Sequence, residues 1–346
     1  MLQHARGLWG TWWWLPPLPW IAYAAALGAL GLGRWDHAVL AVVVAAAAYA
    51  SEGTRRFFLT SLPLLIIFLI YDSMRYWHRI ALDPGDVLSC QLRDAELALF
   101  GVHGAGGQLL TPNQALGRLQ TPALDLLCAV PYGFYLFVLG GHFLYLHFTD
   151  QQTARRFAWI ALGTHLLGFM TYRLLPAAPP WYVDMNGCAV DLAAHNNPAG
   201  LLRVDAMLGT TYFHDLYSRG ATVFGALPSL HVSYPVIGIL ATFRRARPWS
   251  RAIQFLYATV MIFSAIYLNH HWVIDVLLGI SYSLIAAVAV SKLLPEERSG
   301  SRARGQRDFA DSPLAETSGS QSTSGTPSSA LAQRLHTNSA SLSRFR

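Results

Sequence analysis

The chain of 346 residues is too apolar for a soluble protein, because 53% of its residues are hydrophobic and only 13% are charged. Its formal net charge of +6 does not indicate a nucleic-acid partner, since the arginines are scattered among short loops and the C-terminal segment. Several apolar runs approach the ~20 residues needed to cross a bilayer, where backbone must satisfy its own hydrogen bonds. We therefore expect an all-α, polytopic membrane helix bundle.

The N-terminal part begins with a tryptophan cluster, Trp9 and Trp12–Trp14, without a small-residue cleavage site after it. This pattern predicts an uncleaved first span with an interfacial aromatic belt rather than a signal peptide. We expect six to eight membrane-spanning helices among eight apolar segments: 15–33, 37–51, 57–73, 122–148, 157–176, 228–243, 252–269 and 272–294. The second segment is short for a crossing, so a re-entrant hairpin of the first two is the alternative.

Basic residues provide a test of topology. Arginines cluster at 55–56, 155–156 and 244–251, and again beyond 292. Strict alternation through eight spans places all of these on one side together with both termini, which the positive-inside rule makes the cytoplasmic side. The opposite, outer side receives residues 74–121, residues 177–227 and the short turn near Asn269.

These boundaries predict four regions. Residues 1–73 form an N-terminal transmembrane hairpin and a third span, and residues 74–121 form an amphipathic segment at the outer face, with a short helix and a turn. Residues 122–294 form the main helix bundle, whose outer loop 177–227 is polar as far as Phe224. Residues 295–346, rich in Ser, Thr, Gly and Arg, are expected to be a disordered cytoplasmic tail.

The three cysteines, Cys90, Cys128 and Cys188, contain no CxxC pair, so neither a zinc site nor a redox motif is indicated. Cys90 and Cys188 both fall in segments predicted to be outside. A disulfide between them is an alternative, but the sequence favours two unpaired thiols.

Two histidines begin predicted spans at the outer side. His231 follows Pro228-Ser229-Leu230, and His271 opens the run His271-Trp272-Val273-Ile274-Asp275. The fifth span ends at the same depth with Tyr172 and Arg173. Polar side chains near lipid are costly and usually functional, so these clusters predict a site on this face.

The spacing of these residues favours phosphoryl chemistry. His271 and Asp275 are four apart on a helix, so the carboxylate can accept from one imidazole nitrogen and leave the other as the nucleophile. His231 lies at a helix N-terminus, which favours an anion. A phosphate between the two imidazoles could be attacked by one while the other protonates the leaving oxygen. Arg173 and Arg219 are the natural cations.

The other histidines have plainer interpretations. His142, His147 and His165 are expected to be solvated or snorkelling side chains, and His195 and His214 to be loop residues. A metal site built from His270, His271 and Asp275 lacks a further ligand cluster with suitable spacing, so no metal and no cofactor are expected.

Two motifs resemble those of the type 2 phosphatidic acid phosphatase (PAP2) superfamily. They are Leu227-Pro228-Ser229-Leu230-His231 and Ser264-x-x-Tyr267-x-x-x-His271-x-x-x-Asp275, which resemble its second and third signature motifs. Tyr172-x-x-x-Pro176-x-x-Pro179-Pro180-Trp181-Tyr182 and the pair His270-His271 resemble the inositol phosphorylceramide synthase (aureobasidin-resistance) branch. The resemblance covers roughly residues 83–294.

The resemblance implies a PAP2-like six-helix core and a phosphohistidine mechanism without metal. His271 would be the nucleophile, Asp275 would orient it, and His231 would be first the general acid and then the base. The substrate-binding candidates are Tyr172, Arg173, Arg219, Ser229, Tyr267 and His270.

Departures from the family pattern concern its cations. Hydrolases of the superfamily have a Lys where this chain has Gly168, and arginines where it has Leu175 and Ala265. A phosphodiester carries one negative charge and needs fewer counter-charges than a phosphomonoester. The resemblance therefore implies transfer of a phosphorylated headgroup from a phosphatidylinositol-like donor to a ceramide-like acceptor.

Weaker expectations complete the hypothesis. Asp184, Asp191 and Asp215 are candidates for contacting sugar-like hydroxyls in the outer loop. The rival functions are a lipid phosphate phosphatase that uses water, and a non-catalytic membrane module or transporter, although transporters usually place broken helices at the midplane. Composition favours a bacterial inner membrane with a periplasmic site, or a Golgi-type membrane in a eukaryote. Oligomeric state is not indicated.

Overall fold

The structure is a computed structural model that describes residues 2–294, except for the side chains of residues 77–81. A short helix α1 (Leu2–Trp9) and a 3-10 turn η1 (Gly10–Trp12) precede the main helices. All eight apolar segments are helical: α2 (Leu18–Ala29), α3 (Trp35–Tyr49), α4 (Glu52–Ala81), α7 (Pro122–Thr149), α8 (Gln151–Leu174), α12 (Leu230–Thr242), α13 (Pro248–Tyr267) and α14 (Val273–Leu293). The prediction of a polytopic helical membrane protein is confirmed.

The helices differ in how well they could cross a bilayer. Among the described residues, α4, α7, α13 and α14 combine the necessary length and apolarity, whereas α2, α3 and α12 are apolar but shorter. Helix α8 is long enough, with 24 residues, but has arginines near both ends. Hydroxyl side chains cap several N-termini, as when Ser51 accepts from the Thr54 amide and Thr121 from the Leu124 amide.

Helix α8 occupies the centre of the bundle. It packs against α4, α7, α12 and α14, while α12 also packs against α13 and α14. Half of the buried residues of α8 are alanine, glycine or threonine, and a Cβ at Gly163 would already lie 3.1 Å from that of Ala286 on α14. Small residues allow helix backbones to approach closely where lipid offers no hydrophobic drive.

The N-terminal helices are joined to α4 through one buried carboxylate. Asp72 accepts a hydrogen bond from Tyr23 at 2.7 Å and contacts His37 at 3.0 Å. Arg75 pairs with the same carboxylate at 3.2 Å and donates to the carbonyl oxygen of Arg219. A charge of this kind inside a helix bundle needs such partners to be stable. Asp72 thus links α2 and α3 to the 177–227 segment.

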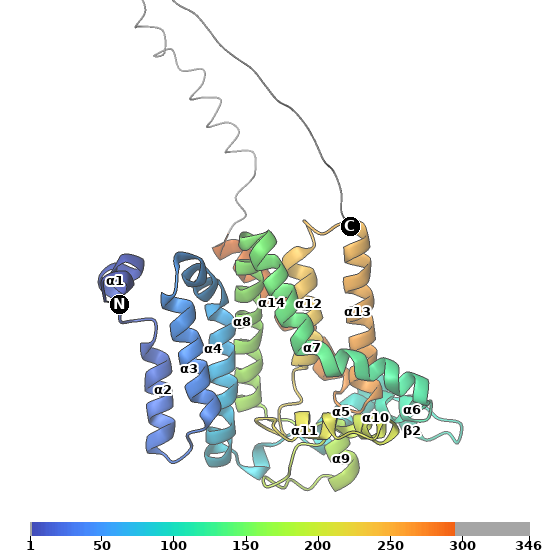
Figure 1. Cartoon of the computed structure of the whole chain (residues 1–346). Coiled ribbons are helices and arrows are strands. Elements are labelled where there is room, and N and C mark those ends of the chain that lie inside the picture. The colour runs from blue at the N-terminus through green and yellow to red at the C-terminus, as the bar shows by residue number, and fades with distance from the viewer. Residues whose placement is uncertain (1, 295–346) are drawn as a thin grey trace, which may run out of the picture. The chain divides into compact units, whose positions relative to one another are not determined.

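A cap of short elements gathers at one end of the bundle (Figure 1). It contains η2 (Pro84–Asp86), α5 (Cys90–Phe100), α6 (Pro112–Gly117), α9 (Pro180–Asn186), η3 (Ala199–Leu201), α10 (Leu202–Leu208) and α11 (Tyr212–Tyr217). Antiparallel β1 (Val102–His103) and β2 (Leu109–Leu110) form a small hairpin in it that the sequence did not predict.

The cap has a hydrophobic core of its own. Trp181, Tyr182, Phe224 and Trp272 pack together and are nearly fully buried. The stretch that was expected to be polar as far as Phe224 also buries Leu201, Val204 and Phe213, because these apolar residues lie in short helices that pack inward. Three extended segments meet beneath this core through parallel bridges that join Leu88 to Ala177 and Ala177 to Gly225.

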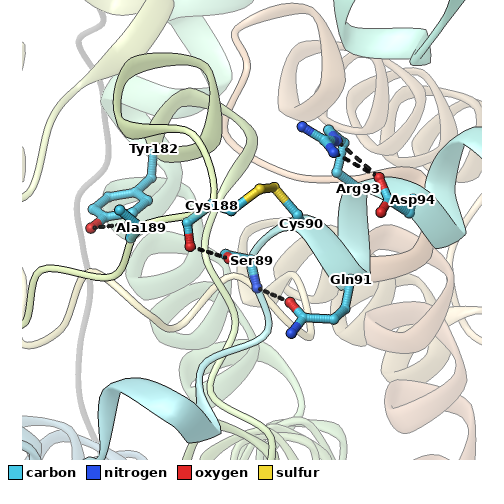
Figure 2. Close-up of a disulfide and its surroundings, with 8 residues drawn as sticks. All are labelled: Ser89, Cys90, Gln91, Arg93, Asp94, Tyr182, Cys188 and Ala189. Carbon is cyan, nitrogen blue, oxygen red and sulfur yellow. Dashed lines mark hydrogen bonds and ion pairs between the residues drawn. A yellow bond between two sulfur atoms is a disulfide. The ribbon is translucent and has the colours of Figure 1, made fainter.

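A disulfide fastens the cap. Cys90, the first residue of α5, is bonded to Cys188 with their Cα atoms 5.2 Å apart, and Ser89 donates to the Cys188 carbonyl beside it (Figure 2). The sequence favoured unpaired thiols, and this expectation is wrong. The separation of 98 positions between the two cysteines hid the fact that α5 and the segment after α9 lie side by side.

Three histidines differ from expectation, and one of them is His214, which lies in helix α11 instead of in a loop. His147 and His165 are 5% and 2% exposed, so neither is solvated or snorkelling. One ring nitrogen of His165 donates to the Ala161 carbonyl within its own helix, which satisfies the buried imidazole. The predicted tail, 295–346, lies outside the described residues.

Candidate active site

Two imidazoles from distant parts of the chain meet at the capped end of the bundle. His231 lies in the first turn of α12, and His271 lies in the short connection between α13 and α14. Nδ1 of His231 is 3.2 Å from Nε2 of His271. Both predicted catalytic histidines are therefore within reach of one small group.

The partners of His271 determine its tautomer. Its Nδ1 lies 3.0 Å from the carbonyl oxygen of Ala226, which can only accept, so Nδ1 carries the proton. Its Nε2 consequently has a free lone pair, and Nδ1 of His231 must be the donor of the bond that joins the rings. The lone pair of His271 and the N–H of His231 thus form one direct hydrogen bond between the rings.

Asp275 has a different first partner from the one expected. Its Oδ2 accepts from the backbone N–H of Trp272 at 2.8 Å and lies 3.5 Å from Nδ1 of His271. The carboxylate therefore caps α14 and supports the imidazole at longer range, while the Ala226 carbonyl holds the ring proton. The orienting role of Asp275 remains a prediction.

The loop that carries His271 is held from behind by Asn113 of α6. Its side-chain amide donates to the carbonyl oxygens of Ile266 and His271, both at 2.9 Å. Asn113 was not predicted from the sequence, because an Asn directly after Thr-Pro is typical of a turn. One amide thus fixes both ends of the connection.

Glu96 supports the same connection from α5. It is fully buried, and its two carboxylate oxygens accept from the backbone N–H groups of Val273 and Ile274 at 2.8 and 3.2 Å. An acceptor at a helix N-terminus satisfies amides that have no partner in the helix. Burial raises the pKa of Glu96 above its usual value. In the sequence, Glu96 is marked only by its position four residues after Leu92, which places both side chains on one face of a helix.

Replacing Glu96 by glutamine is expected to lower both the free energy of unfolding and the rate of the headgroup transfer that the family resemblance implies. The amide has one accepting oxygen, so one N–H of the α14 N-terminus loses its partner, which costs about 1–3 kcal/mol. Thermal unfolding and single-turnover rates measure the two effects. Asp94→Asn, an exposed carboxylate of the same helix, is the control and should change neither. An unchanged melting temperature for Glu96→Gln would contradict this role.

The candidate cations do not bind the histidine pair. Arg173 and Arg219 are exposed, and among residues 2–294 no hydrogen bond or ion pair joins either guanidinium to His231 or His271. Gly168 explains why a lysine is missing, since a Cβ there would lie 3.0 Å from Leu230 and 3.5 Å from Pro228. The wall of the site is filled with apolar side chains at this point.

Three further candidates use their hydroxyls within the protein. Tyr172 donates to the Pro228 carbonyl at 3.0 Å, and Ser229 accepts from the Val232 amide as the cap of α12. Tyr267 donates to Asp125 at 2.9 Å, beside a cavity of about 370 Å³ on the other side of the loop. These bonds position the elements of the site, and a direct substrate contact remains a prediction for all three.

Burial lowers the pKa of His271 to about 4. A nucleophilic nitrogen must be unprotonated, so a lowered pKa keeps the reactive form present from pH 8 down to about 5. In a His231→Asn variant, the rate at which labelled phosphate from a lipid donor becomes bound to the protein should therefore stay constant from pH 8 to about 5. It should fall to half near pH 4. Quenched-flow measurement of the label bound to the protein tests this prediction. A labelling rate that falls to half near pH 6.5 would contradict it.

The sequence profile of the PAP2 superfamily matches residues 110–289, which is more than half of the chain and includes both histidines. The chain belongs to the PAP2 superfamily. The resemblance inferred from the motifs is thereby confirmed.

Relatives of this PAP2 protein are sphingolipid synthases by name. Phosphoinositol dihydroceramide synthase of Bacteroides thetaiotaomicron is 35% identical over 259 residues, which are 73% of this chain and 82% of that protein. Inositol phosphorylceramide synthase of Candida albicans is 28% identical over 71% of this chain and 51% of its own length. The catalytic subunit aur1 of Schizosaccharomyces pombe is 31% identical over 56% and 47%. This chain therefore spans about half of these two fungal relatives, and no solved structure matches it.

Proposed function

We propose that this PAP2 protein transfers an inositol-phosphate-like headgroup from a glycerophospholipid to the hydroxyl of ceramide or a related lipid. The observation that carries the proposal is the 3.2 Å approach of His231 Nδ1 to His271 Nε2, with the tautomer of His271 fixed by the Ala226 carbonyl. The names of its relatives in Bacteroides thetaiotaomicron and Candida albicans state this kind of reaction.

The first step would form a phosphohistidine. Nε2 of His271 attacks phosphorus, the bond from phosphorus to the diacylglycerol oxygen breaks, and His231, protonated on both ring nitrogens, gives a proton to that oxygen. The phosphate charge between the rings favours this protonated form. Diacylglycerol leaves with a neutral hydroxyl.

The second step would reverse the roles. His231, now neutral, takes the proton of the acceptor hydroxyl as its oxygen attacks phosphorus, and the bond to Nε2 of His271 breaks. One proton has been lost and regained by His231, so the site returns to its starting state. General acid–base catalysis of this kind accelerates reactions about 10²- to 10⁴-fold.

The surroundings of the pair favour a phosphodiester lipid as donor. A Cβ at Gly168 would meet Leu230 at 3.0 Å, so a family-type lysine would be tightly packed there, and a singly charged phosphate needs fewer cations. An apolar cavity of about 290 Å³ between α7, α12 and α13 is lined by Tyr135 and Tyr234, and Tyr135 contacts the His231 ring. This cavity would admit a lipid chain beside the reacting atoms.

The orientation in the membrane is part of the proposal. The Cys90–Cys188 disulfide lies in the cap, and disulfides persist in oxidising compartments. The arginine clusters lie at the other ends of the spans, as the positive-inside rule requires of the cytoplasmic side. The histidine pair would therefore face the periplasm of a bacterial inner membrane, or the lumen of a Golgi-type membrane.

Purified protein with phosphatidylinositol labelled in its phosphate should produce labelled inositol phosphorylceramide when ceramide is present. A His271→Gln variant is the matched control and should produce none. Free inositol phosphate as the only labelled product, with or without ceramide, would show that the protein hydrolyses the donor instead of transferring its headgroup.

A further inference from the structure

Three aromatic side chains line one side of the histidine pair. The Tyr132 ring of α7 packs against both His231 and His270, with centroids 4.8 and 4.9 Å away, and the two imidazole centroids are 6.4 Å apart. The Tyr217 ring of α11 lies 4.9 Å from His270 and 6.3 Å from His231. Residues from a bundle helix, a cap helix and the catalytic loop therefore form one wall, which we call the aromatic wall: Tyr132, Tyr217 and His270.

Each member of the aromatic wall has a buried polar atom without a partner among residues 2–294: the two phenol oxygens and Nε2 of His270. Tyr132 and His270 are 0% and 5% exposed. Buried polar groups are nearly always hydrogen-bonded, and each one left without a partner is destabilising. Three such atoms lie on side chains beside the histidine pair, where a polar ligand would give each of them a partner.

The hydrogen-bonding character of these atoms identifies the chemistry of that ligand. His270 hydrogen-bonds to the backbone of Pro198, which has only a carbonyl to offer, so the imidazole donates from Nδ1. Its Nε2 is therefore an acceptor, and burial lowers the pKa of His270 well below its usual value, which keeps it so. Phosphate oxygens only accept and cannot bind there.

The phenols complete a mixed set. Each can donate and accept, and burial among neighbouring phenols raises the pKa of Tyr217 well above its usual value, so it remains neutral. Two donor–acceptor groups and one acceptor match a ligand that carries several hydroxyls, since a hydroxyl also donates and accepts.

We propose that the aromatic wall selects the headgroup by binding its hydroxyls, while His231 and His271 hold the phosphate. This inference rests on the proposed function and assigns its headgroup specificity to Tyr132, Tyr217 and His270. A choline-like headgroup would instead use the rings alone, through cation–π contacts that need no hydroxyl oxygen. The two possibilities are separated by removing the oxygen and keeping the ring.

Tyr132→Phe and Tyr217→Phe are the test variants, and Tyr145→Phe, an exposed position of α7, is the matched control. Transfer to ceramide is measured with phosphatidylinositol and with phosphatidylglycerol, whose headgroup has fewer hydroxyls. Each test variant should lose about threefold to tenfold in the preference for phosphatidylinositol, mainly through KM, because one hydrogen bond is removed. The control should keep the preference of the unmodified protein.

A binding measurement keeps the inference testable apart from the reaction. Inositol 1-phosphate is titrated calorimetrically into the His271→Gln protein, with and without Tyr132→Phe. Weaker binding in the double variant supports the aromatic wall even if the transfer assay fails and the proposed function falls. An unchanged donor preference, an equal loss with both donors, or no binding of inositol 1-phosphate would each overturn it.

Discussion

Replacing His271 by glutamine is expected to reduce headgroup transfer to the uncatalysed background. Glutamine has an acceptor near the position of the imidazole but no nucleophilic nitrogen lone pair, so the bond to phosphorus cannot form. Replacing His231 by asparagine should instead slow both steps by about 10²- to 10⁴-fold, the usual contribution of a general acid and base. Single-turnover transfer from labelled phosphatidylinositol to ceramide measures both.

The chemical bond that holds the label further distinguishes the roles of the two histidines. In the His231→Asn protein, quenching during turnover should trap label on the protein as a phosphoramidate, stable to alkali and labile to acid. The His271→Gln protein should carry none. If label still bound covalently to the His271→Gln protein, the assignment of the nucleophile would be wrong.

Gly279→Ala is expected to be the most disruptive change outside the histidine pair. A Cβ at Gly279 would lie 2.4 Å from the carbonyl oxygen of Ser229 and 3.0 Å from Oγ of Ser233. The Ser229 amide also donates to the Asp275 carbonyl at 2.9 Å, so this contact fixes the start of α12 against α14. Overpacking costs about 1–3 kcal/mol, and a displacement of about 1 Å between reacting groups can cost about 10²-fold in rate.

Thermal unfolding in detergent and transfer rates together test this expectation. Gly140→Ala is the matched control, since a Cβ at this position of α7 meets nothing within 4 Å. It should retain the rate and gain up to about 1 kcal/mol, because alanine loses less backbone entropy in a helix than glycine. If Gly279→Ala unfolded and reacted like Gly140→Ala, the contact of α12 with α14 would not hold the site together.

The bundle could be predicted from the sequence because lipid leaves little freedom. Long apolar runs must be helical, and their ends are marked by arginine clusters and by prolines such as Pro122 and Pro248 at the first helical turn. The approach of His231 to His271 followed from two motifs placed at the same depth. Their distance and tautomer did not, since these depend on the Ala226 carbonyl, a backbone atom that no side-chain pattern reveals.

The packing of the cap could not be predicted from the sequence for a related reason. Its short helices are stabilised by contacts between segments far apart in the chain, such as Glu96 with Val273 and Asn113 with His271. Neither polar residue lies in a motif, and both bind backbone groups. The aromatic wall was missed likewise, since tyrosines at 132 and 217 are ordinary residues for a membrane helix and a loop until their rings meet at His231.

The contact between Gly168 and Leu230 ties the charge of the pocket to the shape of its wall. Because a Cβ at 168 would lie 3.0 Å from Cδ2 of Leu230, a lysine there requires the end of this side chain to shift by a few tenths of an ångström. Converting the scaffold to act on phosphomonoesters would therefore combine this repacking with cations at positions 175 and 265, where the hydrolases of the superfamily have arginines. A lysine at 168 alone would supply one of the three absent charges and would also disturb the packing of Leu230.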